Sequence, residues 1–377
     1  QRALGREFNP NSVNQIKQIL FKHWDLFPDH YTKLGEPSTD DETLRALLVS
    51  SGLEAHQAEF LLNLRRVRRV AKAYGTYIKR LRPRSESIDY DPLAWIEEDE
   101  PEDIAAQREG YRERKKKKRV GLILDDGRIH PDYNVHTPVT GRLSSSNPNA
   151  QNFPRWLRDV VIPQPGHALV GADEDQIELR MASALAGASR YLEVFEVGGD
   201  PHTETALMIF GDLGRQMHDH ACTLYGKKKA KEEPKWSRMR DFAKIFCYLC
   251  IYGGGDETAH VNITSTEDDK GELIYKDISL REIRSRRRTW LDASPEFAKW
   301  WDTTLAKKRK QGFLTDPVLG RRCDFISGDG DEEARNKILN FECQSGAAGV
   351  IHKATLQLVN GGLPFFRWGP GTGLIQQ

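Results

Sequence analysis

Helix-like and strand-like stretches occupy separate parts of this chain. Short strand-like runs and turn signals begin at Val120, with a turn at 125–127 and an apolar run at 167–173. Elsewhere, apolar residues recur every three or four positions, the period of a helix with one buried face. It predicts helices over 11–82, 176–187 and 331–359, and several helical stretches separated by polar loops within 201–320. Such segregation predicts an α+β fold, and it argues against a doubly wound sheet, in which strands and helices alternate.

Charge is unevenly distributed, although the net charge is only +1. Residues 60–85 hold nine Lys or Arg and no acid, whereas residues 89–103 hold eight acids and no base. A helix with a basic face suits a phosphate backbone, although a solvated surface helix would show the same pattern. The face we expect to contact phosphate contains Arg65, Arg68, Arg69 and Lys72. The opposite, apolar face contains Leu64, Val67, Ala71, Tyr74, Ile78 and Leu81.

Cysteine usage and hydropathy exclude two protein classes. The five cysteines are odd in number and irregularly spaced, which argues against a disulfide framework and for a reducing compartment. Cys247 and Cys250 form a C-x-x-C without a second pair, so we interpret them as apolar helix residues and not as zinc ligands. No apolar run approaches the ~18–20 residues of a membrane span. We therefore expect a cytoplasmic protein with no membrane partner.

One predicted helix carries two cations and two aromatics in a row. Arg240, Lys244, Tyr248 and Tyr252 are spaced by four residues, so they drift slowly across a single helix face. Two like charges four residues apart are unfavourable on a bare helix, but an anion between them reverses this. Tyrosine rings offer flat surfaces to a base or sugar. The row fits a nucleotide, or alternatively an ordinary amphipathic helix with solvated cations.

An acidic stretch follows the apolar run. Asp173 ends the expected strand 167–173, where its side chain is a candidate ligand for Mg²⁺. Asp175 and Glu178 have the spacing of a capping box for the helix that follows. Glu178 thus has a structural interpretation, whereas Asp173 is not needed for the cap.

Four blocks in order carry a resemblance to a known family. They read "TGRLSSSNPNAQNFPR" (140–155), "DEDQIELR" (173–180), "RDFAKIFCYLCIYG" (240–253) and "NFECQSGAAGVIHKA" (340–354). In these blocks the chain resembles family A DNA polymerases, with motif B closest to the phage branch. The resemblance implies a right-hand polymerase fold, an α+β architecture with a thumb, a palm with an antiparallel sheet, and helical fingers.

The resemblance also divides the chain into expected regions and implies a reaction. The expected activity is template-directed DNA synthesis from dNTPs on a primer–template, assisted by two Mg²⁺ ions, in a bacterial or viral setting. The expected regions are thumb 1–84, a flexible charged insert 85–119, palm 120–200, fingers 201–320 and a second palm part 321–377.

Residue roles follow from the resemblance position by position. Asp173 and the backbone carbonyl of Glu174 match metal ligands. Glu178 matches a steric gate which, with Tyr252, excludes a ribose 2′-hydroxyl. Further nucleotide contacts match Gln176, His202, Arg240, Lys244, Tyr248 and Tyr252, with Lys244 also a candidate general acid. Primer–template contacts match Arg142, Asn149, Gln151, Asn152, Asn340 and Gln344.

The chain departs from the family pattern in motif A and at its end. Glu174 and Asp175 replace an aromatic and a small residue, and the motif with the second metal carboxylate is expected about three residues beyond Gln377. We therefore expect a fragment that binds primer–template and dNTP but extends poorly unless a C-terminal polymerase fragment is supplied separately. Two alternatives stay open: a non-catalytic primer–template binding protein, and a single-subunit RNA polymerase, against which Glu178 argues.

Overall fold

The structure is a computed structural model that describes residues 8–28, 30–32, 35–49, 52–83, 85, 87–88, 119–135, 137–169, 171–268, 273–325 and 332–360. The N-terminal part contains α1 (Val13–Lys17), the π-helix η1 (Gln18–His23), α2 (Asp41–Val49), α3 (Ala55–Thr76) and the 3₁₀ turn η2 (Ile78–Arg80). The central part contains β1 (Ser87–Ile88), β2 (Arg119–Val120), β3 (Asp132–Asn134), β4 (Ser144–Ser146), η3 (Ala150–Asn152) and η4 (Arg155–Val160).

The remaining elements are mostly helical. They are α5 (Ile177–Ala186), α6 (Ser189–Glu196), α7 (Pro201–Tyr225), η5 (Lys227–Glu232), α8 (Pro234–Ile251), α9 (Asp256–Thr264), α10 (Leu280–Ala293), α11 (Glu296–Gln311), β5 (Phe313–Thr315), β6 (Arg322–Asp324) and α12 (Glu332–Asn360). The strands form antiparallel pairs β1–β2, β3–β4 and β5–β6. Short antiparallel pairs among many helices confirm the α+β class.

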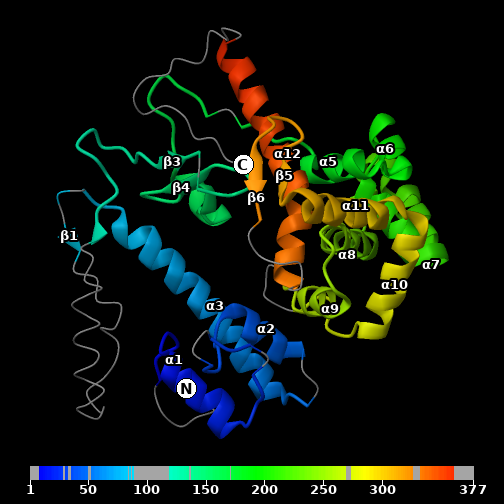
Figure 1. Cartoon of the computed structure of the whole chain (residues 1–377). Helices are drawn as coiled ribbons and strands as arrows, with labels where there is room; N and C mark the ends of the chain where they lie inside the picture. The colour runs from blue at the N-terminus through cyan, green and yellow to red at the C-terminus, as the bar shows by residue number, and fades with distance from the viewer. Residues whose placement is uncertain are drawn as a thin grey trace.

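The largest hydrophobic core lies among helices α5 to α12. Trp236, Trp290, Phe246 and Phe297 are fully buried in it, and each such side chain contributes about 1.5–3 kcal/mol of burial free energy. In Figure 1, α12 runs through the middle of the molecule, with α5, α8 and α11 beside it. This core holds the helices whose outer faces carry the motifs.

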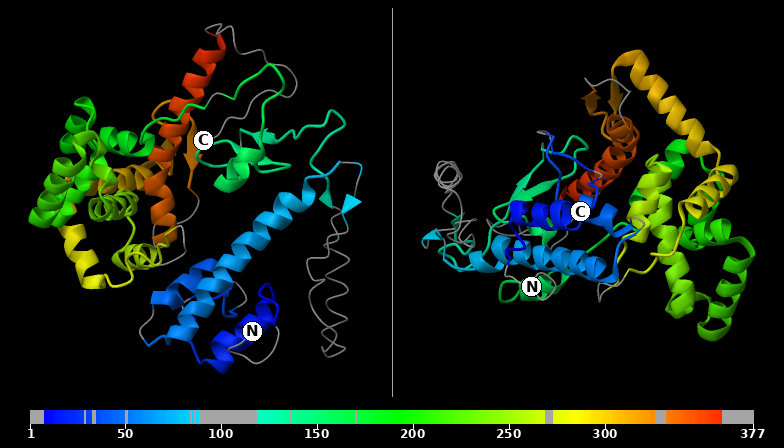
Figure 2. Two further views of the ribbon diagram at one scale, coloured as in Figure 1. Left: turned by 180° about the vertical axis from the view of Figure 1, so that it is seen from behind. Right: turned by 90° about the horizontal axis from the view of Figure 1, so that it is seen from below.

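A second core belongs to the N-terminal helices. Ile16, Leu20, Leu44 and Leu61 are buried there, between α1, α2 and the first half of α3. Beyond this core, α3 extends as a long rod towards β1 and β2 (Figures 1 and 2). The far end of the rod is fixed by Tyr77, whose ring lies edge-on to Phe153 at 4.7 Å.

The apolar face expected on α3 is largely exposed, which corrects the sequence interpretation. Leu64 is buried, but Val67 is 45% and Tyr74 53% exposed, and Ile78 and Leu81 are also exposed. The reason is that α2 and the N-terminal helices cover only the first half of α3. Periodicity therefore predicted the helix correctly but not which face is covered.

Two helices begin where the sequence supplies caps. Asp200 caps α7 by accepting hydrogen bonds from the backbone amides of His202 and Thr203, and Pro201 occupies the first helical position. Glu233 and Pro234 start α8 in the same way. Both helix starts are thus set by local sequence.

A close approach between α5 and α12 depends on glycine. A Cβ at Gly346 would lie 2.9 Å from the Met181 sulfur and 2.8 Å from a Pro317 side-chain carbon. Both distances are shorter than real carbon contacts allow. Gly346 therefore lets α12 pass directly against α5, which carries Glu178.

Several predictions on local structure can be compared with the described residues. The turn at 125–127 is present, with Gly127 at φ +76°, and the helices expected at 176–187 and 331–359 correspond to α5 and α12. Most of the insert 85–119 and all of 361–377 lie outside the described residues. The four regional boundaries stay predictions. None of the described helices has the length and apolar character that crossing a bilayer requires.

Candidate nucleotide and nucleic-acid site

The cation–aromatic row lies on one face of α8. Lys244 is exposed, Arg240 and Tyr248 are half-buried, and Tyr252 forms the C-cap of the helix. The Tyr248 and Tyr252 rings are 6.5 Å apart. The opposite face, including Phe246, is buried in the main core. The helix thus presents cations at one end of its outer face and aromatic rings at the other.

The cationic end is completed by the start of α7. The Arg240 guanidinium donates to both carboxylate oxygens of Asp200, with Nε–O at 2.6 Å and Nη2–O at 3.0 Å. His202 lies beside this pair, and its ring is 5.9 Å from that of Tyr248. Among the residues that the structure describes, Lys244 makes no ion pair. Its charge is therefore available to an anion.

His202 is a buried, neutral base at this position. Its side chain is 2% exposed, and burial lowers its pKa to about 4, with Arg240 and Lys244 acting in the same direction and Asp200 opposing them. The imidazole is therefore uncharged at neutral pH. Its Nδ1 has no hydrogen-bond partner within the described ranges. Buried polar atoms normally have a partner, so a water molecule, an ion or a ligand group would complete this one.

Glu178 links α5 to the aromatic end of the row. Its carboxylate accepts the Tyr252 hydroxyl and forms an ion pair with Arg142. The Cys343 thiol on α12 donates to the Glu178 backbone carbonyl at 3.1 Å. Burial raises the pKa of the Glu178 carboxyl. The predicted gate residue is thus held between α5, α8 and α12.

The capping box expected at 175–178 is not formed. The N-cap of α5 is Gln176, in the left-handed conformation with φ 55°, and no side chain caps the helix. Glu178 points instead to Tyr252 and Arg142, since these partners satisfy its carboxylate. The Gln176 Oε1 atom is buried and has no partner in the described part of the chain.

A cavity of about 450 Å³ adjoins the two tyrosines. Two of its lining residues, Asn336 and Asn340 on α12, have buried side-chain oxygens without a hydrogen-bond partner among the described residues. Amide groups and aromatic rings together suit a nucleobase. The lining residues are Arg45, Ile245, Tyr248, Leu249, Tyr252, Gly254, Thr258, Asn262, Thr266, Asn336 and Asn340.

The remaining expected primer–template residues lie on two elements. Asn149 precedes η3, and its buried Oδ1 has no partner among the described residues. Its backbone carbonyl accepts the Tyr77 hydroxyl, 3.0 Å away. Gln151 and Asn152 lie on η3, half-buried and exposed respectively. Gln344 is half-buried one turn beyond Asn340 on α12. Their contacts with DNA stay predictions.

Arg65 is not on an exposed basic face, which corrects its expected role. Its side chain is 3% exposed and binds Asp41, with Nε–O at 2.7 Å, and Glu267. Arg69 binds the other oxygen of Glu267 at 2.6 Å but is 58% exposed. Burial of an arginine requires paired acids, and α2 and the segment after α9 supply them. Lys72 is exposed, as expected.

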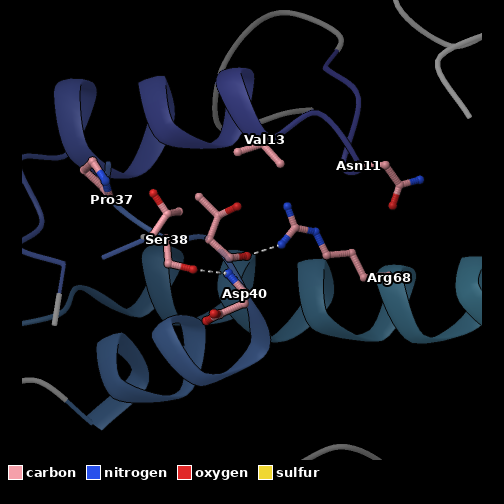
Figure 3. A pocket seen from close by; sticks show the side chains of 8 residues that line it. Asn11, Val13, Pro37, Ser38, Asp40 and Arg68 are labelled. Atoms are coloured by element: carbon pink, nitrogen blue, oxygen red, sulfur yellow. Dashed lines mark hydrogen bonds between the residues drawn. The ribbon is translucent and has the colours of Figure 1, made fainter. Parts of the chain in front are cut away.

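Arg68 is also turned inward. Its guanidinium donates to the backbone carbonyls of Pro10, at 2.8 Å, and Thr39. It lines a cavity of about 340 Å³ together with Val13 and Asp40 (Figure 3). Arg68 therefore ties the N-terminal segment to the loop before α2, and it is not placed to contact a phosphate backbone.

The expected strand at 167–173 is wrong for the residues described there. Leu169 is 56% exposed, and Asp173 and Glu174 are exposed in irregular backbone. An extended segment becomes a strand only with a hydrogen-bonding partner, and the described residues supply none. Asp175 lies close enough to His202 for its charge to raise the pKa of the imidazole against the larger effect of burial.

The described residues do not assemble a metal centre. They contain no group of three or more His, Cys, Asp or Glu side chains arranged to hold an ion. Asp173 and Glu174 therefore do not gain a third protein ligand in this part of the chain. The structure thus supplies no geometry for the expected magnesium ions.

Three site residues were missed from the sequence. In the sequence, Asp200 is recognisable only as an Asp before Pro, which signals the start of a helix. Its ion-pair partner Arg240 lies 40 positions away, so no local pattern links the two residues. Asn336 continues the four-residue spacing of Asn340 and Gln344, so that spacing could have found it. Arg45 reaches the cavity from α2, and no local pattern predicts that approach.

Comparisons with known proteins place the chain in one family. The family model for DNA polymerase family A matches residues 1–361. DNA polymerase I of Lactococcus lactis is 31% identical over 368 residues, 94% of this chain and 33% of the relative. The thermostable DNA polymerase I of Thermus aquaticus is 28% identical, over 95% of this chain and 35% of the relative. The chain thus spans about a third of the length of these curated relatives.

A solved structure shows the same fold. The polymerase domain of Pol1 from M. smegmatis, in complex with DNA primer-template and dNTP, matches with a TM-score of 0.67 and 22% identity, over 97% of this chain and 54% of that one. These relatives are bacterial, and none of them tests the expected phage-type branch. Because the family model covers nearly the whole chain, the chain belongs to DNA polymerase family A.

Proposed function

We propose that this chain carries out template-directed DNA synthesis, transferring a deoxynucleotidyl group from a dNTP to a primer 3′-hydroxyl. The observation that carries the proposal is the outer face of α8, where Arg240 and Lys244 continue into Tyr248 and Tyr252. A triphosphate at the cationic end and a sugar and base at the aromatic end account for the whole row.

In this proposal, different side chains of the described residues bind the phosphates, the sugar and the base. Lys244, which forms no ion pair with the described residues, offers its positive charge to the phosphates. Neutral His202 offers a ring nitrogen that has no partner in the same part of the chain. Glu178, held by Tyr252 and Arg142, blocks the space beside the sugar. Asn336 presents an amide to the base of the nucleotide in the adjoining cavity. These contacts align the nucleotide before reaction.

The reaction itself is a displacement at the α-phosphorus. The primer 3′ oxygen forms the new P–O bond, and the bond to the β-phosphate oxygen breaks, releasing pyrophosphate. The 3′-hydroxyl proton leaves to solvent, and in this proposal Lys244 donates a proton to the departing pyrophosphate. Asp173 and Glu174 stay the predicted ligands of Mg²⁺, which would supply electrostatic stabilisation of the phosphates when bound. No step is assigned to the ions.

Primer–template DNA is the proposed partner, by likeness to the M. smegmatis domain whose title names it. In this chain, exposed Lys72 and Arg69 on α3 and the amides at 149–152 and 340–344 are the proposed contacts. A bacterial or viral cytoplasmic setting, a phage-type origin and a separate C-terminal partner are further proposals that rest on the resemblance alone.

The proposal is tested by two measurements on the 377-residue chain. Binding of a primer–template and of the correct dNTP is measured with a dideoxy-terminated primer, and extension is measured with an ordinary primer and Mg²⁺. We expect dNTP binding to depend on the template base and to be lost in Lys244→Ala. Extension is repeated with a C-terminal family A polypeptide added in trans.

Each outcome has a distinct meaning. Template-dependent binding with extension, alone or in trans, supports the enzyme. Template-dependent binding without extension under either condition favours a non-catalytic primer–template binding protein. Absence of dNTP binding by a folded chain overturns the proposal.

A further inference from the structure

The Asp200–Arg240 pair has a geometry beyond what a helix cap requires. The Asp200 oxygens accept from Arg240 Nε and Nη2 at 2.6 and 3.0 Å, as a two-pronged contact along one edge of the guanidinium. A guanidinium has five N–H groups. The opposite edge, made by Nη1 and the second Nη2 hydrogen, is left outside this contact.

Asp200 is itself held rigidly at the start of α7. Its oxygens accept from the backbone amides of His202 and Thr203, at 3.3 and 3.2 Å, and from the Thr203 hydroxyl at 2.7 Å. Burial raises the pKa of Asp200, but the hydrogen bonds from Arg240 and Thr203 outweigh it, and the net pKa lies below the usual value. The carboxylate therefore stays ionised beside Arg240.

The neighbouring acid does not act in the same way. The Asp241 carboxylate lies 3.8 Å from Arg240 Nη1, beyond hydrogen-bond distance, and its side chain is 57% exposed. Solvent-exposed pairs of this kind contribute little. Among the described residues, Asp200 alone grips the guanidinium with both oxygens.

We propose that Asp200 is a positioning residue for nucleotide binding, which fixes the Arg240 guanidinium so that its free edge faces the triphosphate. The inference rests on the proposed function and adds to it a residue that does not itself touch the nucleotide. The plane of an arginine fork must be aligned to grip phosphate with two bonds. Asp200 provides that alignment before the nucleotide arrives, since α7 fixes its own position.

The test uses Asp200→Asn and a matched control. Asparagine caps helices as well as aspartate, so α7 keeps its cap while the charged two-pronged contact is lost. We expect the dissociation constant for dATP, measured opposite template thymine with a dideoxy-terminated primer–template, to rise about tenfold, which is about 1.4 kcal/mol. The melting temperature should fall only by the worth of the lost ion pair, and the affinity for primer–template alone should stay unchanged. Asp241→Asn should change the dATP constant less than twofold.

Two further variants make the result specific. Asp200→Ser keeps a hydroxyl that can cap α7 but has no second oxygen to bind the Arg240 guanidinium. It should weaken dATP binding as much as Asp200→Asn does, so either variant alone can give the test if the other folds poorly. In an Arg240→Lys background, Asp200→Asn should have no additional effect, because a lysine has no plane to orient. An additive effect there would show that Asp200 acts through another group and would overturn the inference.

The sign of the change separates this inference from simpler electrostatics. Removing a negative charge near a triphosphate would by itself tighten binding. Unchanged or tighter dATP binding in folded Asp200→Asn therefore overturns the positioning role while leaving the proposed function intact. A wild-type chain that fails to bind dATP at all overturns both.

Discussion

Tyr252 donates its phenolic hydroxyl to the Glu178 carboxylate, joining the C-terminal end of α8 to the first turn of α5. The same carboxylate pairs with Arg142. Three segments that are far apart in the sequence therefore meet at one acidic side chain. Any group that enters beside the tyrosines meets a carboxylate whose position is fixed by two partners.

Removing this carboxylate should relax sugar selection. In Glu178→Ala the space beside the sugar opens, so we expect discrimination between dNTP and rNTP to fall at least roughly tenfold in single-nucleotide insertion. Tyr252→Phe should give a smaller loss, because the ring stays while the hydrogen bond is lost. Glu196→Ala, an exposed acid on α6, serves as the control. Undiminished rNTP rejection in Glu178→Ala would contradict the gate.

The Tyr248 hydroxyl should determine how readily 3′-dideoxynucleotides are used. Burial raises the pKa of Tyr248 to about 12, so the phenol stays protonated and can donate a hydrogen bond near the sugar. By resemblance to the phage branch, we expect ready ddNTP incorporation by the wild type. Tyr248→Phe should lower it roughly tenfold relative to dNTP, the worth of one hydrogen bond. Equal ddNTP-to-dNTP ratios in competitive insertion assays on both proteins would refute this role.

Breaking the Glu267 contacts should destabilise the N-terminal helices. Glu267→Gln leaves the buried Arg65 with Asp41 alone, and removing one partner of a buried pair typically costs about 3–5 kcal/mol. The measurement is urea unfolding followed by amide exchange in α2 and α3. Asp212→Asn disrupts the exposed pair with Arg215 and should cost under about 1 kcal/mol. Equal losses in both variants would show that burial does not matter here.

Acid should destabilise the protein through His202. Its pKa is about 4 in the folded state and about 6.5 in an unfolded chain. Between these values the unfolded state binds more protons, so the unfolding free energy rises with pH across this window. We expect His202→Gln to flatten that slope, removing about 3 kcal/mol of the change between pH 6.5 and pH 4. His220→Gln, exposed on the same helix, should retain the wild-type slope.

Salt dependence should identify which α3 cations contact DNA. Lys72 is exposed, whereas Arg68 donates to two backbone carbonyls. We expect Lys72→Gln to reduce the slope of log K against log salt by about 1 for primer–template binding, the value for one lost phosphate contact. Arg66→Gln, at another cation on the same helix, tests whether any charge removal suffices. An unchanged slope in Lys72→Gln would place the DNA elsewhere.

Local rules predicted the helices of this protein well. The four-residue spacing on α8 and the periodicity of α12 depend on neighbours in the sequence, and both elements appear where expected. The C-x-x-C cysteines are buried in α8, as expected of apolar helix residues.

Features that depend on distant partners were not predictable in the same way. Arg65 is buried because Glu267, 202 positions away, meets it. Glu178 does not form the expected capping box, and its carboxylate instead accepts a hydrogen bond from Tyr252, 74 positions away. The run at 167–173 has the composition of a strand, but a strand also needs a second strand to hydrogen-bond with, and composition does not show whether one is present. Sequence patterns thus predicted the helices better than the pairings between side chains of distant segments.

The close approach of α5 and α12 at Gly346 is another feature that depends on residues far apart in the sequence. Gly346 touches no proposed ligand group, yet it sets how closely the helix bearing Asn340 approaches the helix bearing Glu178. A methyl group there would collide with the Pro317 ring and the Met181 side chain, so one of these groups or α12 itself would have to shift. The spacing between α5 and α12 therefore depends in part on the absence of a side chain at a single position.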